Sequence, residues 1–192
     1  ISWYQLTIEP NTIFFRKPPL LPDEDLIWMI QNQGEELLAA NNFIQYEVSA
    51  YTHANNKCQH NLNYWHFGDY IGIGPGAHGK ITKSNGQIFR TCKLTKPQTY
   101  LAAKTNTLLA MKPQMLTKRD LINEFILNAL RLKEGFTLDL FEARTGVDKK
   151  CLTPELTKAA SKGLIIFDGE KVRASTEGYR FLNTTLTFLF QQ

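Results

Sequence analysis

The character of the chain changes at Lys112-Pro113, and this change constrains the fold more than any other feature of its 192 residues. Upstream, short apolar segments of the kind that form strands alternate with helical periodicity, which is typical of an α/β protein. Downstream, closely spaced capping residues start several helices around one short hairpin. We therefore predict an α/β part at 1–112 and a small, mainly helical domain at 113–192.

The α/β part begins with Ile1–Ile8, which has no charged side chain and is rich in aromatic and β-branched residues. Such a run predicts a buried strand of a parallel sheet. The acids of Asp23–Asp25 predict the start of a helix to about Ala40, because they complement the helix dipole. Gly34 falls on the apolar stripe of that helix and predicts a close approach to the sheet.

Two further strands are predicted at 43–51 and 70–74, followed by a hairpin around Asn85-Gly86. That dipeptide favours a type I′ turn, whose two central residues both need positive φ. Pro97 then predicts the start of a helix that reaches about Leu109.

The downstream domain has its own local signals. Thr117, Thr137 and Thr153 each precede a helical pattern and predict three helix starts. Asp168-Gly169 joins two short apolar segments in a hairpin, and a last helix is predicted over 176–189. Three helices, a wing-like hairpin and a final helix resemble a winged-helix arrangement.

Charge and cysteine content exclude several classes of protein. The net charge is only +4, and the basic residues between 149 and 173 are interleaved with acids, so we expect no nucleic-acid partner. Cys58, Cys92 and Cys151 lie far apart, form no CxxxCxxC motif and cannot build a metal site from cysteine alone. This sparse, odd set favours a reducing, cytoplasmic setting, and no apolar run is long enough to span a bilayer.

The segment Cys58–Trp65 gathers the side chains most able to take part in chemistry. A neutral His60 could ligate a haem iron, with Tyr64 and Trp65 packing on the macrocycle. From spacing alone, a loop histidine satisfied by hydrogen bonds is the commoner case. Cys58 is an alternative soft ligand, although such a cysteine is more often a small buried hydrophobe.

The glycine-rich run Gly72–Gly79 follows almost at once and would let the backbone approach a cofactor closely. It lacks GxGxxG and a phosphate-loop lysine, so it is not a nucleotide signature, and a tight turn explains it equally well. Glu9 and Asp69 are candidate acid–base groups, but nothing pairs them in the sequence, and a cap or salt-bridge role is the simpler interpretation.

Taken in order, four segments resemble the second half of the oxygen-independent coproporphyrinogen III oxidase-like family of radical S-adenosylmethionine (SAM) proteins. They are Ile1–Thr12, Pro18–Asp25, the HNxxYW segment His60–Trp65, and Gly72–His78. The resemblance implies the second half of a partial (β/α) barrel followed by a small helical, winged-helix-like domain.

The HNxxYW motif is the mark of the haem chaperone branch of that family. The resemblance implies that His60 is a ligand of the haem iron and that Asn61, Tyr64 and Trp65 belong to the same site. It further implies that Thr7, Ala77 and His78 help to line the SAM pocket.

The family also uses a [4Fe–4S] cluster held by CxxxCxxC, which this chain lacks, so these residues alone cannot generate a radical. The implied partners are haem and a haem-accepting protein, with a membrane-associated acceptor and a homodimer as further expectations. Two alternatives stay open: oxidative decarboxylation of coproporphyrinogen III to protoporphyrinogen IX, and nucleic-acid binding by the winged-helix-like domain.

Overall fold

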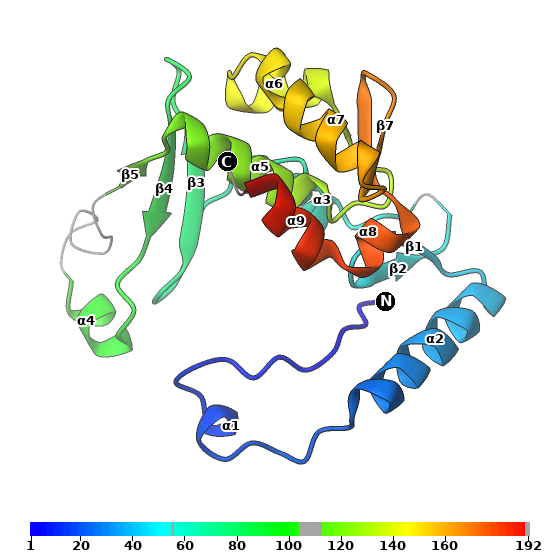
Figure 1. Cartoon of the computed structure of the whole chain (residues 1–192). Helices are drawn as coiled ribbons and strands as arrows, with labels where there is room; N and C mark the ends of the chain where they lie inside the picture. The colour runs from blue at the N-terminus through cyan, green and yellow to red at the C-terminus, as the bar shows by residue number, and fades with distance from the viewer. Residues whose placement is uncertain (55, 104–112, 191–192) are drawn as a thin grey trace. The chain divides into compact units, whose positions relative to one another are not determined.

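The computed structural model describes residues 1–54, 56–103 and 113–190 (Figure 1). It divides into two compact units, Ile1–Lys57 and Cys58–Gln192. The domain boundary predicted at 112/113 falls inside the second unit. It adjoins residues that the structure does not describe, and it stays a prediction. Within the described ranges, no helix is both long and apolar enough to cross a membrane.

The first unit consists of two helices and a hairpin, with the bounds α1 Ile13–Arg16, α2 Glu24–Ala40, β1 Ile44–Glu47 and β2 Ala50–Thr52. The predicted helix is confirmed, and the Asp23 carboxylate accepts a hydrogen bond from the Leu26 N–H at 2.8 Å. Gly34 does permit a close approach, but to the Trp3 ring: a Cβ there would lie 0.9 Å from Trp3 Cη2.

The strand predicted at Ile1–Ile8 is wrong beyond its first residues. Ser2 bridges Ala50 in antiparallel fashion, but the chain then leaves the sheet, and Tyr4 is 72% exposed. An apolar run becomes a strand only where a neighbour continues the hydrogen-bond ladder. The segment predicted as one strand at 43–51 is instead the β1–β2 hairpin, which reverses direction at Val48-Ser49. The prediction was wrong because the alternation of apolar and polar residues does not distinguish one strand from two short paired strands.

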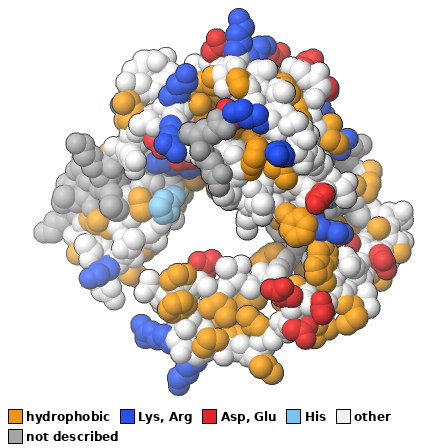
Figure 2. All heavy atoms as spheres, viewed as in Figure 1, with side chains coloured by type: hydrophobic (Ala, Val, Ile, Leu, Met, Phe, Trp, Pro, Cys, Tyr) orange, Lys and Arg blue, Asp and Glu red, His pale blue; other side chains and the backbone are white. Residues whose placement is uncertain are grey.

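Apolar side chains of α1 and α2 remain exposed, and Figure 2 colours hydrophobic side chains orange. They include Phe14, Phe15, Trp28, Met29 and Leu37.

The second unit carries two three-stranded antiparallel sheets, ordered β3-β4-β5 and β6-β8-β7. Its elements are α3 Gln59–Trp65, β3 His78–Thr82, β4 Ile88–Cys92, α4 Pro97–Ala102, β5 Gln114–Met115, α5 Lys118–Ala129, β6 Phe136–Thr137, α6 Leu138–Thr145, the 3₁₀ helix η1 Lys149–Leu152, α7 Thr153–Ser161, β7 Ile165–Phe167, β8 Lys171–Ala174, α8 Thr176–Arg180 and α9 Leu182–Phe190. Phe125 is fully buried at the centre, and its ring meets those of Phe67, Phe136 and Phe141 edge-on.

Local signals predicted the α-helices that follow residue 113 well. Thr117 and Asp120 form a reciprocal capping box at α5, and Thr137 caps α6. The β7–β8 hairpin is confirmed, but β6, which pairs with β8, was missed because it is only two residues long. The predicted last helix breaks at Phe181 into α8 and α9.

Two predictions upstream of α5 need correction. Of the strand predicted at 70–74, only Tyr70 forms a bridge, to Lys80, and Ile73 is 88% exposed. The Asn85-Gly86 hairpin is present, but among the residues of its turn only Gly86 has positive φ, so the turn is not type I′. Pro97 starts α4 as predicted, whereas the part of that helix predicted beyond Ala103 lies outside the described residues.

A matched pair of glycines tests the packing of the second sheet. Gly135 and Gly163 have similar positive φ values, but a Cβ at Gly135 would lie 1.8 Å from the Val172 carbonyl oxygen, whereas one at Gly163 has nothing within 4 Å. Gly163→Ala should cost only backbone strain, about 1–2 kcal/mol. Gly135→Ala should cost roughly 1–3 kcal/mol more, because the β6–β8 pairing must shift. Urea unfolding measures both, and equal losses would contradict this packing.

Candidate functional site

The HNxxYW motif forms a short helix rather than the loop that the sequence suggested. Cys58 is the N-cap of α3, and His60 and Tyr64 lie four residues apart on one helical face. Their rings meet edge-on, with centroids 4.8 Å apart. His60 is exposed, whereas Asn61, Tyr64 and Trp65 are half-buried. The structure therefore presents an accessible imidazole on an aromatic support.

The C-terminal end of α3 is fixed to the core of the second unit. Phe67 has a φ of 56°, which is rare for a bulky residue, and its ring is 1% exposed against Phe125. Asn63 secures the turn, because its carbonyl accepts from the Gly68 N–H at 2.7 Å and its side-chain amide donates to the Asp69 carbonyl at 2.9 Å. Burial of the phenyl ring offsets the unfavourable backbone conformation.

A chain of polar and aromatic contacts leads from α3 to α5. The rings of Tyr64 and Tyr70 are 4.5 Å apart. The Arg90 Nη1 donates to the Tyr70 hydroxyl at 2.6 Å, and its Nε donates to Glu124 at 2.8 Å. The Glu124 carboxylate raises the pKa of Arg90 despite the opposing effect of burial. Arg90 on β4 thereby connects the motif helix to α5.

Trp65 faces a second cation. The Arg131 guanidinium lies 4.5 Å from the centroid of the indole, within the range of a cation–π contact. The buried Trp65 Nε1 and Arg131 Nε have no hydrogen-bond partner among the described residues. Both atoms are donors only, and a buried donor without an acceptor costs about 1–3 kcal/mol.

Lys80 is 2% exposed and lies beneath α3. Its ammonium donates to Asp69 at 2.7 Å and stands 4.3 Å from the Phe67 ring centroid. Burial lowers the pKa of Lys80 even though Asp69 opposes the shift. Burial acts to raise the pKa of Asp69, but hydrogen bonds from Lys80 and Thr82 outweigh it and hold that pKa below its usual value. The burial penalty falls mainly on the lysine because the Asp69 side chain is 44% exposed.

These residues line a partly open cavity of about 160 Å³. Its lining contains two cations, three aromatic rings that carry a polar atom, and no carboxylate. The residues are Tyr64, Trp65, Phe67, Gly68, Tyr70, Lys80, Arg90 and Asn128. We refer to it below as the α3 cavity. Sequence reasoning missed it, because its members come from four separate stretches of the chain.

The glycine-rich run forms a tight, irregular turn leading into β3. Gly74 and Gly76 have positive φ, and a Cβ at Gly72 would lie 2.2 Å from the His78 carbonyl oxygen. His78 Nε2 lies 3.7 Å from Cys92 Sγ across the β3–β4 pair. Ala77 is half-buried, and its carbonyl accepts from the Lys93 N–H. Thr7 belongs to the first unit, where it is exposed.

The two candidate acid–base groups lie in different units. The Asp69 carboxylate is the partner of Lys80. At Glu9 the backbone carbonyl accepts from the Thr12 hydroxyl at the start of α1, and a role for its carboxylate stays a prediction. No group of three or more His, Cys, Asp or Glu side chains suited to a metal ion occurs within the described ranges.

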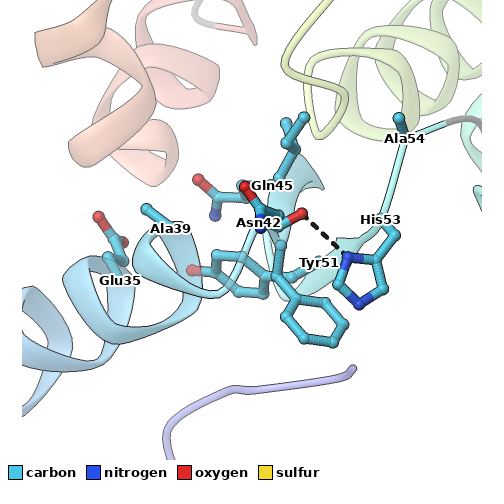
Figure 3. Close-up of a pocket in the computed structure, with 9 residues that line it drawn as sticks. Glu35, Ala39, Asn42, Gln45, Tyr51, His53 and Ala54 are labelled. Carbon is cyan, nitrogen blue, oxygen red and sulfur yellow. Dashed lines mark hydrogen bonds between the residues drawn. The ribbon is translucent and has the colours of Figure 1, made fainter.

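A larger hollow of about 730 Å³ lies within the first unit and contains none of the predicted site residues. Figure 3 shows Glu35 and Ala39 of α2 on one side and His53 on the other, with the contact of 3.2 Å between His53 Nδ1 and the Asn42 carbonyl. Burial raises the pKa of Tyr51 in its wall to about 12, and Glu35 adds to the shift. The hollow is larger than the α3 cavity, but its lining belongs to the first unit and the motif belongs to the second.

Comparison with known proteins shows which proteins the chain is similar to. Residues 116–181 match the model of the HemN C-terminal domain. The chain is 43% identical over 186 residues to "Heme chaperone HemW" of Escherichia coli (strain K12), covering 97% of this chain and 48% of the relative. The Haemophilus influenzae protein of the same name is 41% identical with the same coverage. The mouse "Radical S-adenosyl methionine domain-containing protein 1, mitochondrial" is 31% identical over 204 residues, covering 100% of this chain and 46% of the relative.

A solved structure agrees with the fold. It is described as "Coproporphyrinogen III oxidase (HemN) from Escherichia coli is a Radical SAM enzyme", and it matches with a TM-score of 0.65 over 89% of this chain and 42% of that chain. At 12% sequence identity the match shows an α/β fold alone. The chain spans about half the length of the curated relatives that it matches.

The way in which the free energy of unfolding changes at acidic pH tests the Asp69–Lys80 pair. Because the pKa of Asp69 is lowered in the folded state, the carboxylate stabilises the fold above its ordinary pKa of 3.8, and this contribution is lost as pH falls through the lower folded value. Asp69→Asn should therefore destabilise the protein at pH 7, and the difference from the wild type should shrink below about pH 4. Urea unfolding at several pH values measures it, and a difference independent of pH would contradict the assignment.

Proposed function

We propose that this chain, which belongs to the oxygen-independent coproporphyrinogen III oxidase-like family, is the haem-binding part of a haem chaperone that passes haem to an acceptor protein. The near relatives named above carry that name over nearly the whole length of this chain. The single observation that carries the proposal is the exposed imidazole of His60, set on a helix that is fixed to a rigid core.

The chemistry of His60 suits a transient haem ligand. A neutral imidazole binds haem iron through one ring nitrogen. The Tyr64 ring packs edge-on against the imidazole and restricts its rotation, so that less conformational freedom is lost when iron binds. Because His60 lies at the surface rather than in an enclosed pocket, an acceptor can reach the haem and replace this ligand.

The aromatic side chains next to His60 would support the porphyrin. Tyr64, Trp65 and Tyr70 lie along and just beyond α3, and each is half-buried, so part of each ring stays available to a flat apolar ligand. Asn61 follows His60 directly and completes the set that we assign to the haem site.

The cofactors of the family are a separate matter. A [4Fe–4S] cluster with SAM supplies radical chemistry in radical SAM proteins, but the described residues offer no group that fits the cluster. We therefore derive no step through it. The roles of Thr7, Ala77 and His78 toward SAM remain predictions, as do the half-barrel, the winged-helix likeness, a cytoplasmic location, a membrane-associated acceptor and a homodimer.

Haem titration tests the proposal. The protein that carries this chain should develop a Soret band on titration with haem, and His60→Ala should weaken binding by at least about tenfold, because the iron loses its ligand. His53→Ala is the matched control, since this exposed histidine lies in the first unit outside the motif. Binding that survives His60→Ala, or no Soret band at all, would overturn the haem site. Porphyrinogen turnover with SAM and reductant would then be the next assay.

A further inference from the structure

The α3 cavity is rich in hydrogen-bond donors. Lys80, Arg90 and Trp65 all line it, and the buried Nε1 of Trp65 finds no acceptor among the described residues. An indole N–H can only donate. An occupant that completes the site must therefore bring acceptor atoms.

The two cations keep donors to offer although each already has a carboxylate partner. Lys80 donates one bond to Asp69, and an ammonium has three donors. Arg90 donates from Nε and Nη2 to Glu124 and from Nη1 to Tyr70, and a guanidinium carries a second N–H on both Nη atoms. Neither Asp69 nor Glu124 lines the cavity, whereas Lys80 and Arg90 both do.

The size of the cavity limits the occupant to a small group. About 160 Å³ corresponds to roughly five water volumes. Ligands of drug size need about 300–1,000 Å³. A carboxylate with a short alkyl stem fits this space, but a porphyrin ring does not.

The cavity lies directly beside the proposed iron ligand. Tyr64 both contacts the His60 imidazole and lines the cavity. His60 and Tyr64 are four positions apart, which is a rise of about 6 Å along α3. That span is on the scale of half a porphyrin, so an iron held at His60 would place an edge of the macrocycle near the cavity mouth.

We propose that the α3 cavity binds a propionate carboxylate of the porphyrin cargo, with Trp65 Nε1, Arg90 and Lys80 as its donors. The inference rests on the proposed function, because it takes the ligand to be a haem held at His60. Two fixed points, the iron at His60 and the carboxylate in the cavity, would set the orientation of the porphyrin on α3.

Esterification of the propionates tests the proposal without changing the protein. Haem and haem dimethyl ester share the iron and the ring, but the ester has lost its negative charge. The wild-type protein should bind the ester at least about tenfold more weakly than haem, since a charge-assisted contact is lost. In Trp65→Phe, which keeps a ring over Arg131 and removes the N–H, the ratio between the two ligands should fall, because one of the three donors is lost while Lys80 and Arg90 remain.

A second measurement reports on the cavity itself. In protein labelled with ¹⁵N-tryptophan, the indole N–H resonance that disappears in Trp65→Phe belongs to Trp65. It should lie further downfield with haem than with the dimethyl ester, because the iron and the ring act alike in both and only haem offers a carboxylate acceptor. Comparison with Trp3 and Trp28, which belong to the first unit, controls for general effects of the ligand.

The outcomes separate the two proposals. Weaker binding of the ester together with a shifted Trp65 resonance supports the carboxylate site. Equal binding of haem and ester, both lost in His60→Ala, would overturn the carboxylate site and leave the haem function in place. Failure of both porphyrins to bind would overturn the proposed function and the inference with it.

Discussion

The ring of Phe67, held against Phe125 by a backbone of positive φ, is the contact on which the candidate site depends. It closes α3 onto the core of the unit in which residues 116–181 match the model of the HemN C-terminal domain. A seven-residue helix of polar character would not persist by its own propensity. Removing a fully buried phenylalanine ring costs about 3–5 kcal/mol, so this packing is ample to hold α3 in place.

Two further contacts connect the same helix to α5 and to the residues just after it. The path from Tyr64 through Tyr70 and Arg90 to Glu124 reaches α5, and the Trp65 ring lies against Arg131 just after α5. Each contact leaves something unsatisfied at the cavity, namely spare donors on cations and an indole N–H without an acceptor. The structure thus combines a rigid support with hydrogen-bond donors for which a ligand can supply the acceptors.

Local chemistry explains which parts of the fold the sequence could predict. The capping box of Thr117 and the Thr137 cap act within one helical turn, so their helices were found. The prediction of a strand over Ile1–Ile8 was wrong, because a strand needs a neighbouring strand to pair with and local composition does not show whether one is available. The residues of the candidate site differ in the same respect. His60 and Tyr64 belong to a recognisable motif and could be predicted. Arg90 and Glu124 are 34 residues apart in the sequence, so their contact leaves no local pattern.

Chemical rescue is the measurement that tests the central claim most directly. In His60→Gly, haem binding should be lost, and added imidazole should restore the Soret band, because α3 and its aromatic support remain in place to receive the porphyrin while free imidazole supplies the missing ligand. A variant that imidazole leaves unchanged, or that binds haem without it, would show that the His60 side chain is not the ligand that holds the iron.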